Sequence, residues 1–157
     1  MALWIMRHGE ALGGDIDELR ELSEEGQRQC VQAGDWLAGR IRQPGGLRII
    51  SSPYQRARHT AAIVADSCAA EVAESDLLRP DGDVELILEW LTATEEAEDR
   101  LIVSHMPLVG RLVGRLLEGD VHASHPFTTA EVIGLDAEVW AAGCAMHYAG
   151  FYPTAQG

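Results

Sequence analysis

Short, largely apolar runs alternate along the chain with segments of helical periodicity. Three of these runs are Leu3–Met6, Leu47–Ile50 and Arg100–Val103, and each leads through a polar loop into a predicted helix. Continuous apolar runs of this length are typical of strands buried on both faces. Strands that alternate with helices favour a parallel sheet covered by helices. We therefore expect an α/β fold with three layers, a mostly parallel central sheet with helices on both faces, built as one domain over residues 1–157.

Local signals predict where two of the helices begin. Ser23 is a good N-cap residue, and the acidic residues that follow it suit the positive end of a helix dipole, so we expect a helix from there to about Arg40. Proline is favoured in the first helical turn. A second helix is therefore predicted from Pro53 to about Ser67, with Ser52 as its cap.

The remainder of the chain is predicted in the same way. Leu77–Asp83 is expected to be a loop before a helix that starts near Val84, and Pro107 is expected to open the last helix. The runs Ala130–Leu135 and Glu138–Tyr148 are predicted to form a hairpin.

Charge and composition exclude several classes of partner. The 12 basic and 25 acidic side chains give a net charge of −13, which repels nucleic acid and anionic membranes. No stretch is long and apolar enough to predict a membrane span. The N-terminus lacks the features of a signal peptide, and the 3 cysteines are scattered as in reduced proteins. We expect a cytoplasmic protein with no nucleic-acid or membrane partner.

Ionisable residues follow three of the predicted strands. Arg7 and His8 end the first, Arg56 lies one turn into the helix after the second, and His105 follows a later one. Ligands of open α/β sheets bind at the carboxyl ends of the strands, so these side chains are expected to meet. Two arginines can clamp phosphoryl oxygens, and a neutral imidazole can accept the phosphoryl group covalently. The arginines would repel a cation, so we expect no metal and no other cofactor.

Four segments, taken in chain order, resemble the histidine phosphatase superfamily. They are Arg7-His8-Gly9-Glu10, the L-S-x-x-G segment Leu22–Gly26, the S-P-x-x-R-A-x-x-T segment Ser52–Thr60, and Ser104-His105-Met106-Pro107. The first motif is weak alone, whereas the ordered set covers nearly the whole chain. The short chain, the loop before Val84 and the Ser-His-Met-Pro-Leu-Val run look most like the SixA-type phosphohistidine phosphatases.

The resemblance implies a phosphoglycerate mutase-like fold and a set of roles. His8 would be the catalytic nucleophile, transiently phosphorylated, and Arg7, Arg56 and His105 would act in catalysis and bind the phosphoryl group of the substrate. Mutase-like members carry a general-acid Glu after the second helix, and this sequence has no clear counterpart.

The missing acid bears on the substrate. A protonated imidazole leaves easily, so the lack of a strong acid favours a P–N bond over a phosphate ester. Asp81, Asp83 or Glu85 remain candidates for the acid. We expect a metal-independent phosphatase that acts on phosphorylated histidine in a protein, such as a histidine phosphotransfer domain of a signalling relay. The alternatives are a small-molecule phosphomonoesterase of the same superfamily and a non-catalytic phosphate-binding module.

Overall fold

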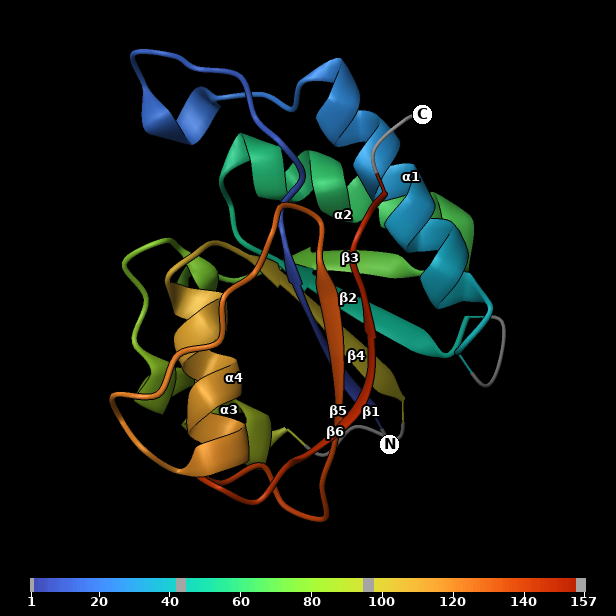
Figure 1. The fold of residues 1–157 in the computed structure, drawn as a ribbon. Helices are drawn as coiled ribbons and strands as arrows, with labels where there is room; N and C mark the ends of the chain where they lie inside the picture. Colours follow the sequence, from blue (N-terminus) through green and yellow to red (C-terminus); the bar gives the residue numbers. More distant parts are fainter. Residues whose placement is uncertain (1, 42–44, 95–97, 155–157) are drawn as a thin grey trace.

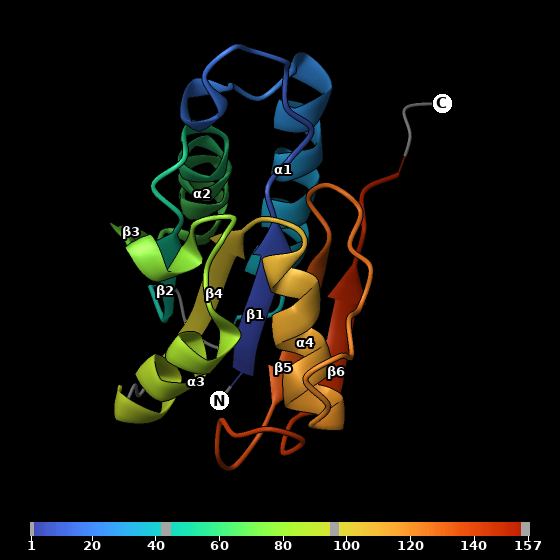
Figure 2. The same ribbon diagram turned by 90° about the vertical axis from the view of Figure 1, so that its left-hand side faces the viewer.

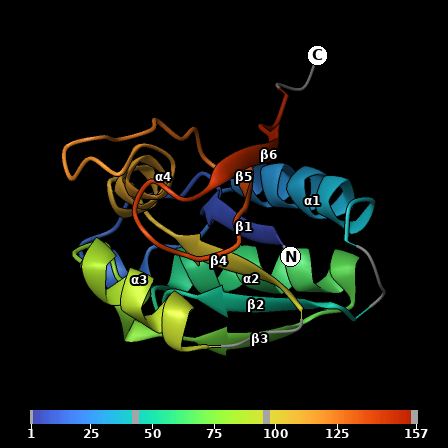
Figure 3. The ribbon, with the colours of Figure 1, turned by 90° about the horizontal axis from the view of Figure 1, so that it is seen from below.

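The computed structural model describes residues 2–41, 45–94 and 98–154. One six-stranded sheet with the order β3-β2-β4-β1-β5-β6 runs through it, and the strands can be followed one beside the next in Figure 3. The strands are β1 (Ala2–Arg7), β2 (Leu47–Ser51), β3 (Glu71–Glu74), β4 (Asp99–Ser104), β5 (Val132–Asp136) and β6 (Met146–Phe151). The α-helices are α1 (Glu24–Ala38), α2 (Gln55–Cys68), α3 (Val84–Ala93) and α4 (Leu108–Glu118).

The sheet is mostly parallel, as predicted. Strands β1, β2, β3 and β4 pair in parallel with one another, β5 pairs antiparallel with β1, and β6 pairs antiparallel with β5. Parallel neighbours need a crossover connection, and here helices supply it. The carboxyl ends of β1 and β4 therefore lie side by side at one edge (Figure 2).

Helices cover both faces of the sheet, which confirms the three-layer prediction. Helices α1 and α2 lie on one face, and α3 and α4 lie on the other (Figure 1). Along β1, Trp4 and Met6 pack into the core under α1 and α2, whereas Leu3 and Ile5 pack into the core under α3 and α4. Because side chains alternate between the two faces of a strand, burial on both sides requires the unbroken apolar run seen in the sequence.

The predicted helix starts are only partly right. The Ser23 hydroxyl accepts the Gly26 N–H at 2.9 Å, so this residue caps α1 as expected. Helix α2 begins at Gln55 and not at Pro53, because Tyr54 is extended and its N–H bonds to the Ser52 hydroxyl at 3.2 Å. Pro107 is the N-cap of α4, one residue before the helix proper.

Two predictions near loops were also wrong in detail. The stretch expected to be a loop before α3 contains the short 3₁₀ helix η2 (Asp76–Leu78). The pairing of β5 with β6 is antiparallel as predicted, but β6 begins at Met146, well after Glu138. The intervening chain bonds to the end of α4, with the Ala145 N–H donating to the Leu116 carbonyl at 3.0 Å. Because this segment packs against α4, β5 and β6 are joined by a long connection and not by the tight hairpin that was predicted.

Two further observations concern membrane-spanning helices and cysteines. Within the described ranges, no helix has the length and apolar character needed to cross a membrane. Cys30 and Cys68 are buried free thiols, and Cys144 is an exposed one.

Candidate active site

The ends of β1 and β4 bring two imidazoles together. Arg7 pairs with Ser104 in the parallel register, so the residues that follow, His8 and His105, leave the sheet at the same edge. Their ring centroids lie 5.2 Å apart with the planes tilted by 58°. Both side chains are buried. The register of two central strands thus brings His8 and His105 together, as predicted from their positions at the ends of parallel strands.

His8 is held with one ring nitrogen ready to act as a base or nucleophile. Its Nδ1 atom lies 2.7 Å from the Gly9 carbonyl oxygen, which can only accept, so Nδ1 carries the proton. The Nε2 atom then keeps its lone pair and lies 3.3 Å from the Nε atom of Arg56. Burial, with the added charges of Arg56 and Arg7, lowers the pKa of His8 to about 4. The ring is therefore neutral at neutral pH.

Two guanidinium groups flank this imidazole. Arg56 is buried, and its Nη1 atom donates to the Asp17 carbonyl oxygen at 2.7 Å while Nη2 lies 3.3 Å from the Asp17 carboxylate. The Nη1 atom of Arg7 donates to the Phe127 carbonyl oxygen at 2.9 Å. Burial, together with the charge of Arg56, lowers the pKa of Arg7. Two neighbouring cations next to a neutral imidazole form an environment that favours an anion.

His105 is oriented by the turn that precedes α2. Its Nε2 atom lies 2.7 Å from the Ser52 hydroxyl, and that hydroxyl also accepts the Tyr54 N–H. When the serine proton points to His105 Nε2, Nδ1 carries the ring proton. Burial, then the neighbouring His8 and Arg56, lowers the pKa of His105 to about 3.

Two buried nitrogens at this edge have no hydrogen-bond partner among the described residues. They are the Nε atom of Arg7 and the Nδ1 atom of His105. Buried polar groups are nearly always paired, so two unpaired nitrogens in one place, one of them the N–H of an arginine, call for a partner from outside the chain. A phosphoryl group carries several acceptor oxygens and the negative charge that the arginines favour.

The glycines of two motif segments hold the loop that carries His8. The Gly9 N–H donates to the Thr60 hydroxyl at 3.1 Å, and a Cβ atom at Gly9 would lie 2.7 Å from the Cys30 sulfur. A Cβ atom at Gly26 would lie 2.0 Å from the Glu10 carbonyl oxygen. Side chains are therefore excluded where α1 meets the loop. The sequence shows these glycines only as members of motifs, and the structure shows why a larger side chain does not fit at either position.

Two of the three carboxylates proposed from sequence as an acid are engaged elsewhere. Asp83 accepts the Glu85 N–H at 2.9 Å as the cap of α3, and Glu85 pairs with Arg115 at 2.8 Å. The third, Asp81, is exposed. Their part in the chemistry stays an open prediction.

Asp17 is a carboxylate at the site that no sequence pattern predicted. It lies in the short 3₁₀ helix η1 (Asp17–Leu19), between β1 and α1, and its side chain contacts Arg56. No periodicity or motif marks this residue in the sequence. Arg58, on the same helix as Arg56, instead pairs with Glu74 at 3.4 Å away from the site, as its place on the helix predicts.

Comparison with known proteins identifies the family. A sequence model of the histidine phosphatase superfamily (branch 1) matches residues 3–80. Phosphohistidine phosphatase SixA of Escherichia coli (strain K12) is 35% identical over 139 residues, which cover 84% of this chain and 83% of that protein. The chain belongs to the histidine phosphatase superfamily.

Within the superfamily, the similarity is to the SixA-type branch. The SixA homolog of Haemophilus influenzae (strain ATCC 51907 / DSM 11121 / KW20 / Rd) is 31% identical over 144 residues, covering 85% of this chain and 88% of that protein. A solved structure of the protein histidine phosphatase SixA complexed with tungstate superimposes with a TM-score of 0.82 at 30% identity, covering 97% of each chain. The predicted superfamily, branch and fold are thereby confirmed.

Proposed function

We propose that this protein is a phosphatase for phosphorylated histidine in proteins, with His8 as the phosphoryl acceptor. The observation that carries the proposal is the state of His8, whose neutral Nε2 atom lies 3.3 Å from Arg56 at the edge where Arg7 and His105 also lie. An imidazole with a free lone pair beside two fixed cations suits attack on a phosphoryl group.

The reaction we propose has two displacements. In the first, the lone pair of His8 Nε2 forms a bond to phosphorus while the bond from phosphorus to the leaving group breaks. In the second, water attacks the same phosphorus, the P–Nε2 bond breaks, and phosphate departs with the lone pair restored to the ring. Arg7 and Arg56 would neutralise the charge on the phosphoryl oxygens in both steps, and the unpaired His105 Nδ1–H would donate to one of them.

The leaving group is inferred from the absence of an acid hydrogen-bonded to the two histidines among the described residues. Asp83 and Glu85 already serve helix α3 and Arg115. An ester needs a proton for its alkoxide, whereas the imidazole of a phosphohistidine can leave already protonated. The resemblance to SixA proteins, one of them solved with the tetrahedral anion tungstate, supports the same choice.

The substrate and its setting are part of the proposal. We expect a histidine phosphotransfer domain of a signalling relay as the phosphorylated partner, in the cytoplasm, with no cofactor. The net charge of −13 disfavours nucleic acid as a partner.

Turnover of matched substrates tests the proposal. We would compare kcat/KM for a phosphohistidine peptide with kcat/KM for phosphosugars and nucleotides, using the wild-type protein and H8A. Wild type should favour the peptide, and H8A should lose turnover. Brief incubation followed by an alkaline quench, which preserves phosphohistidine, should label wild type and not H8A.

Each alternative has its own outcome in this experiment. A preference for an ester would indicate a small-molecule phosphomonoesterase. Phosphate binding with no turnover of any substrate would indicate a binding module. If H8A kept a near-normal rate on the peptide, the assignment of the nucleophile would be wrong.

A further inference from the structure

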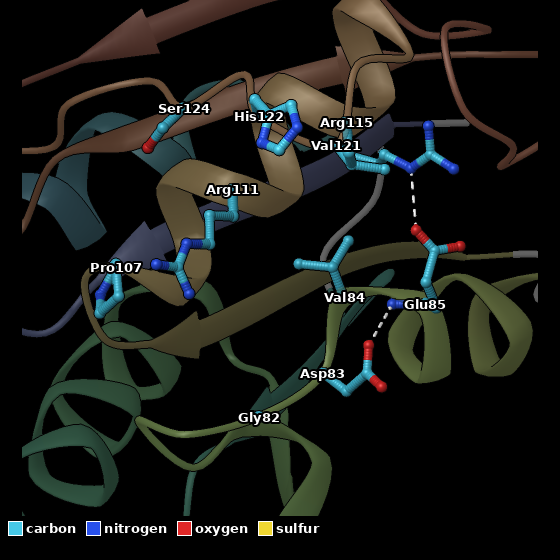
Figure 4. Close-up of a pocket in the computed structure, with 10 residues that line it drawn as sticks. All are labelled: Gly82, Asp83, Val84, Glu85, Pro107, Arg111, Arg115, Val121, His122 and Ser124. Carbon is cyan, nitrogen blue, oxygen red and sulfur yellow. Dashed lines mark hydrogen bonds and ion pairs between the residues drawn. The ribbon is translucent and has the colours of Figure 1, made fainter.

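A groove opens between α3 and α4, next to the proposed active site. It encloses a cavity of about 710 Å³, and its lining includes Gly82, Val84, Pro107, Arg111 and His122 (Figure 4). Pro107 lies two residues after His105, so the groove starts where the chain leaves the active site. One wall of the groove is thus continuous in sequence with His105.

Among the described residues, the cation of Arg111 at the groove has no partner. Asp83 caps α3, and Glu85 forms an ion pair with Arg115 at 2.8 Å. The Arg111 guanidinium is exposed and has no ion pair or side-chain hydrogen bond to any described residue. In a chain with a net charge of −13, an unpaired arginine in a hollow favours an incoming carboxylate over any other side chain.

The wall of the groove is fixed to the active-site strand. The Ser104 hydroxyl, at the end of β4, donates to the Leu78 carbonyl oxygen at 2.7 Å. A Cβ atom at Gly82 would lie 2.8 Å from the Leu108 side chain and 2.4 Å from the Leu77 carbonyl oxygen, so the loop packs closely on the start of α4. The loop that forms one wall of the groove is therefore fixed to the strand that leads into His105.

We infer that this groove binds the polypeptide segment next to the phosphohistidine of the substrate protein, with an Asp or Glu of that segment on Arg111. The inference rests on the proposed function and adds a rule of sequence preference to it. Pro107 and Val84 offer apolar contact to the segment, and Ser124 and His122 offer hydrogen bonds to its backbone. The groove would then hold the segment next to the phosphohistidine, while the residues around His8 hold the phosphoryl group.

A series of phosphohistidine peptides tests this inference. In each peptide one Glu is moved stepwise away from the phosphohistidine, and a second series carries Lys at the same positions. At the spacing that reaches Arg111, wild type should show a kcat/KM about fivefold higher for the Glu peptide than for its Lys counterpart, the size of one exposed ion pair. R111E should reverse the preference, and added salt should diminish it.

Arg48 supplies the matched control, because it is exposed and likewise without a side-chain partner among the described residues, but lies near the amino end of β2. R48E should keep the wild-type preference, and R111E should hydrolyse the small P–N compound phosphoramidate at the wild-type rate. Equal rates for Glu and Lys peptides at every spacing would overturn the inference alone. Hydrolysis of phosphoramidate but of no peptide would contradict the proposed function too. Wild type that hydrolysed neither would overturn the proposed function as well.

Discussion

The Nε atom of Arg56 lies 3.3 Å from the Nε2 atom of His8, although 48 positions separate the two residues in the chain. The contact orients the guanidinium of Arg56 and affects the protonation of the His8 ring. It directs an N–H of the guanidinium to the lone pair that would attack phosphorus, and its positive charge helps to keep that lone pair unprotonated. The same guanidinium is anchored at its far end by Asp17.

Replacing Arg56 by Lys should lower kcat/KM for a phosphohistidine peptide by a factor on the order of 100. A Lys keeps the charge but lacks the planar fork that reaches both His8 and Asp17. Steady-state kinetics would measure the effect, with R58K as the control because Arg58 pairs with Glu74 outside the site. Equal losses in the two variants would contradict the proposed role of Arg56.

His8 should remain neutral well below the pH at which a free histidine is protonated. Its pKa lies at about 4 in the folded protein, against 6.5 for an unperturbed ring, because burial and two arginines disfavour the charged form. Between pH 6.5 and 4 the unfolded chain therefore binds a proton that folded His8 does not, so the free energy of unfolding contributed by His8 falls as the pH decreases.

Nuclear magnetic resonance of the imidazole nitrogens checks this expectation. From pH 7.5 down to about 5, the His8 signals should keep the chemical shifts of a neutral ring protonated at Nδ1. The same ring in urea-unfolded protein, with a pKa of about 6.5, is the reference. A midpoint near that value in the folded protein would show that the site does not keep the ring neutral.

Substituting Gly9 by Ala should destabilise the fold by about 1–3 kcal/mol and impair catalysis. The new methyl group would lie 2.7 Å from both the Cys30 sulfur and the Gly26 carbonyl oxygen, so the loop that carries His8 has to move. Urea unfolding and kcat together measure the two effects. G13A is the matched control, since nothing lies within 4 Å of a Cβ atom there. It should leave both quantities unchanged.

Ser52 should act as a positioning residue for His105. S52A removes the hydroxyl that lies 2.7 Å from His105 Nε2 and leaves a buried ring nitrogen unpaired, at a cost of about 1–2 kcal/mol. We expect kcat to fall more than KM changes, because the donor to the phosphoryl group is misplaced, and we expect S52T to restore part of the rate. S67A, which removes a hydroxyl at the carboxyl-terminal end of α2 that donates to Asp35 of α1 at 3.3 Å, should leave both kcat and KM unchanged.

Local sequence determined much of this protein. Apolar runs such as the one that contains Ile5 and the capping signal of Ser23 act within a few residues, so the order of strands and helices could be predicted. Parallel strands share one carboxyl edge, and that rule alone is enough to predict that His8 and His105 lie together. The motif resemblance added the family, which the comparisons confirm.

Only the tertiary structure decided the finer geometry. Three features join parts of the chain that no local pattern connects. They are the hydrogen bonds of Arg56 to Asp17, the close approach of Gly26 to Glu10, and the late start of β6 that results from contacts with α4. Such contacts arise when whole elements pack, and their energies outweigh the weak preferences of a turn or a loop. Arg111, which has no partner among the described residues, is the same kind of feature, because a sequence cannot show which charged side chains form ion pairs.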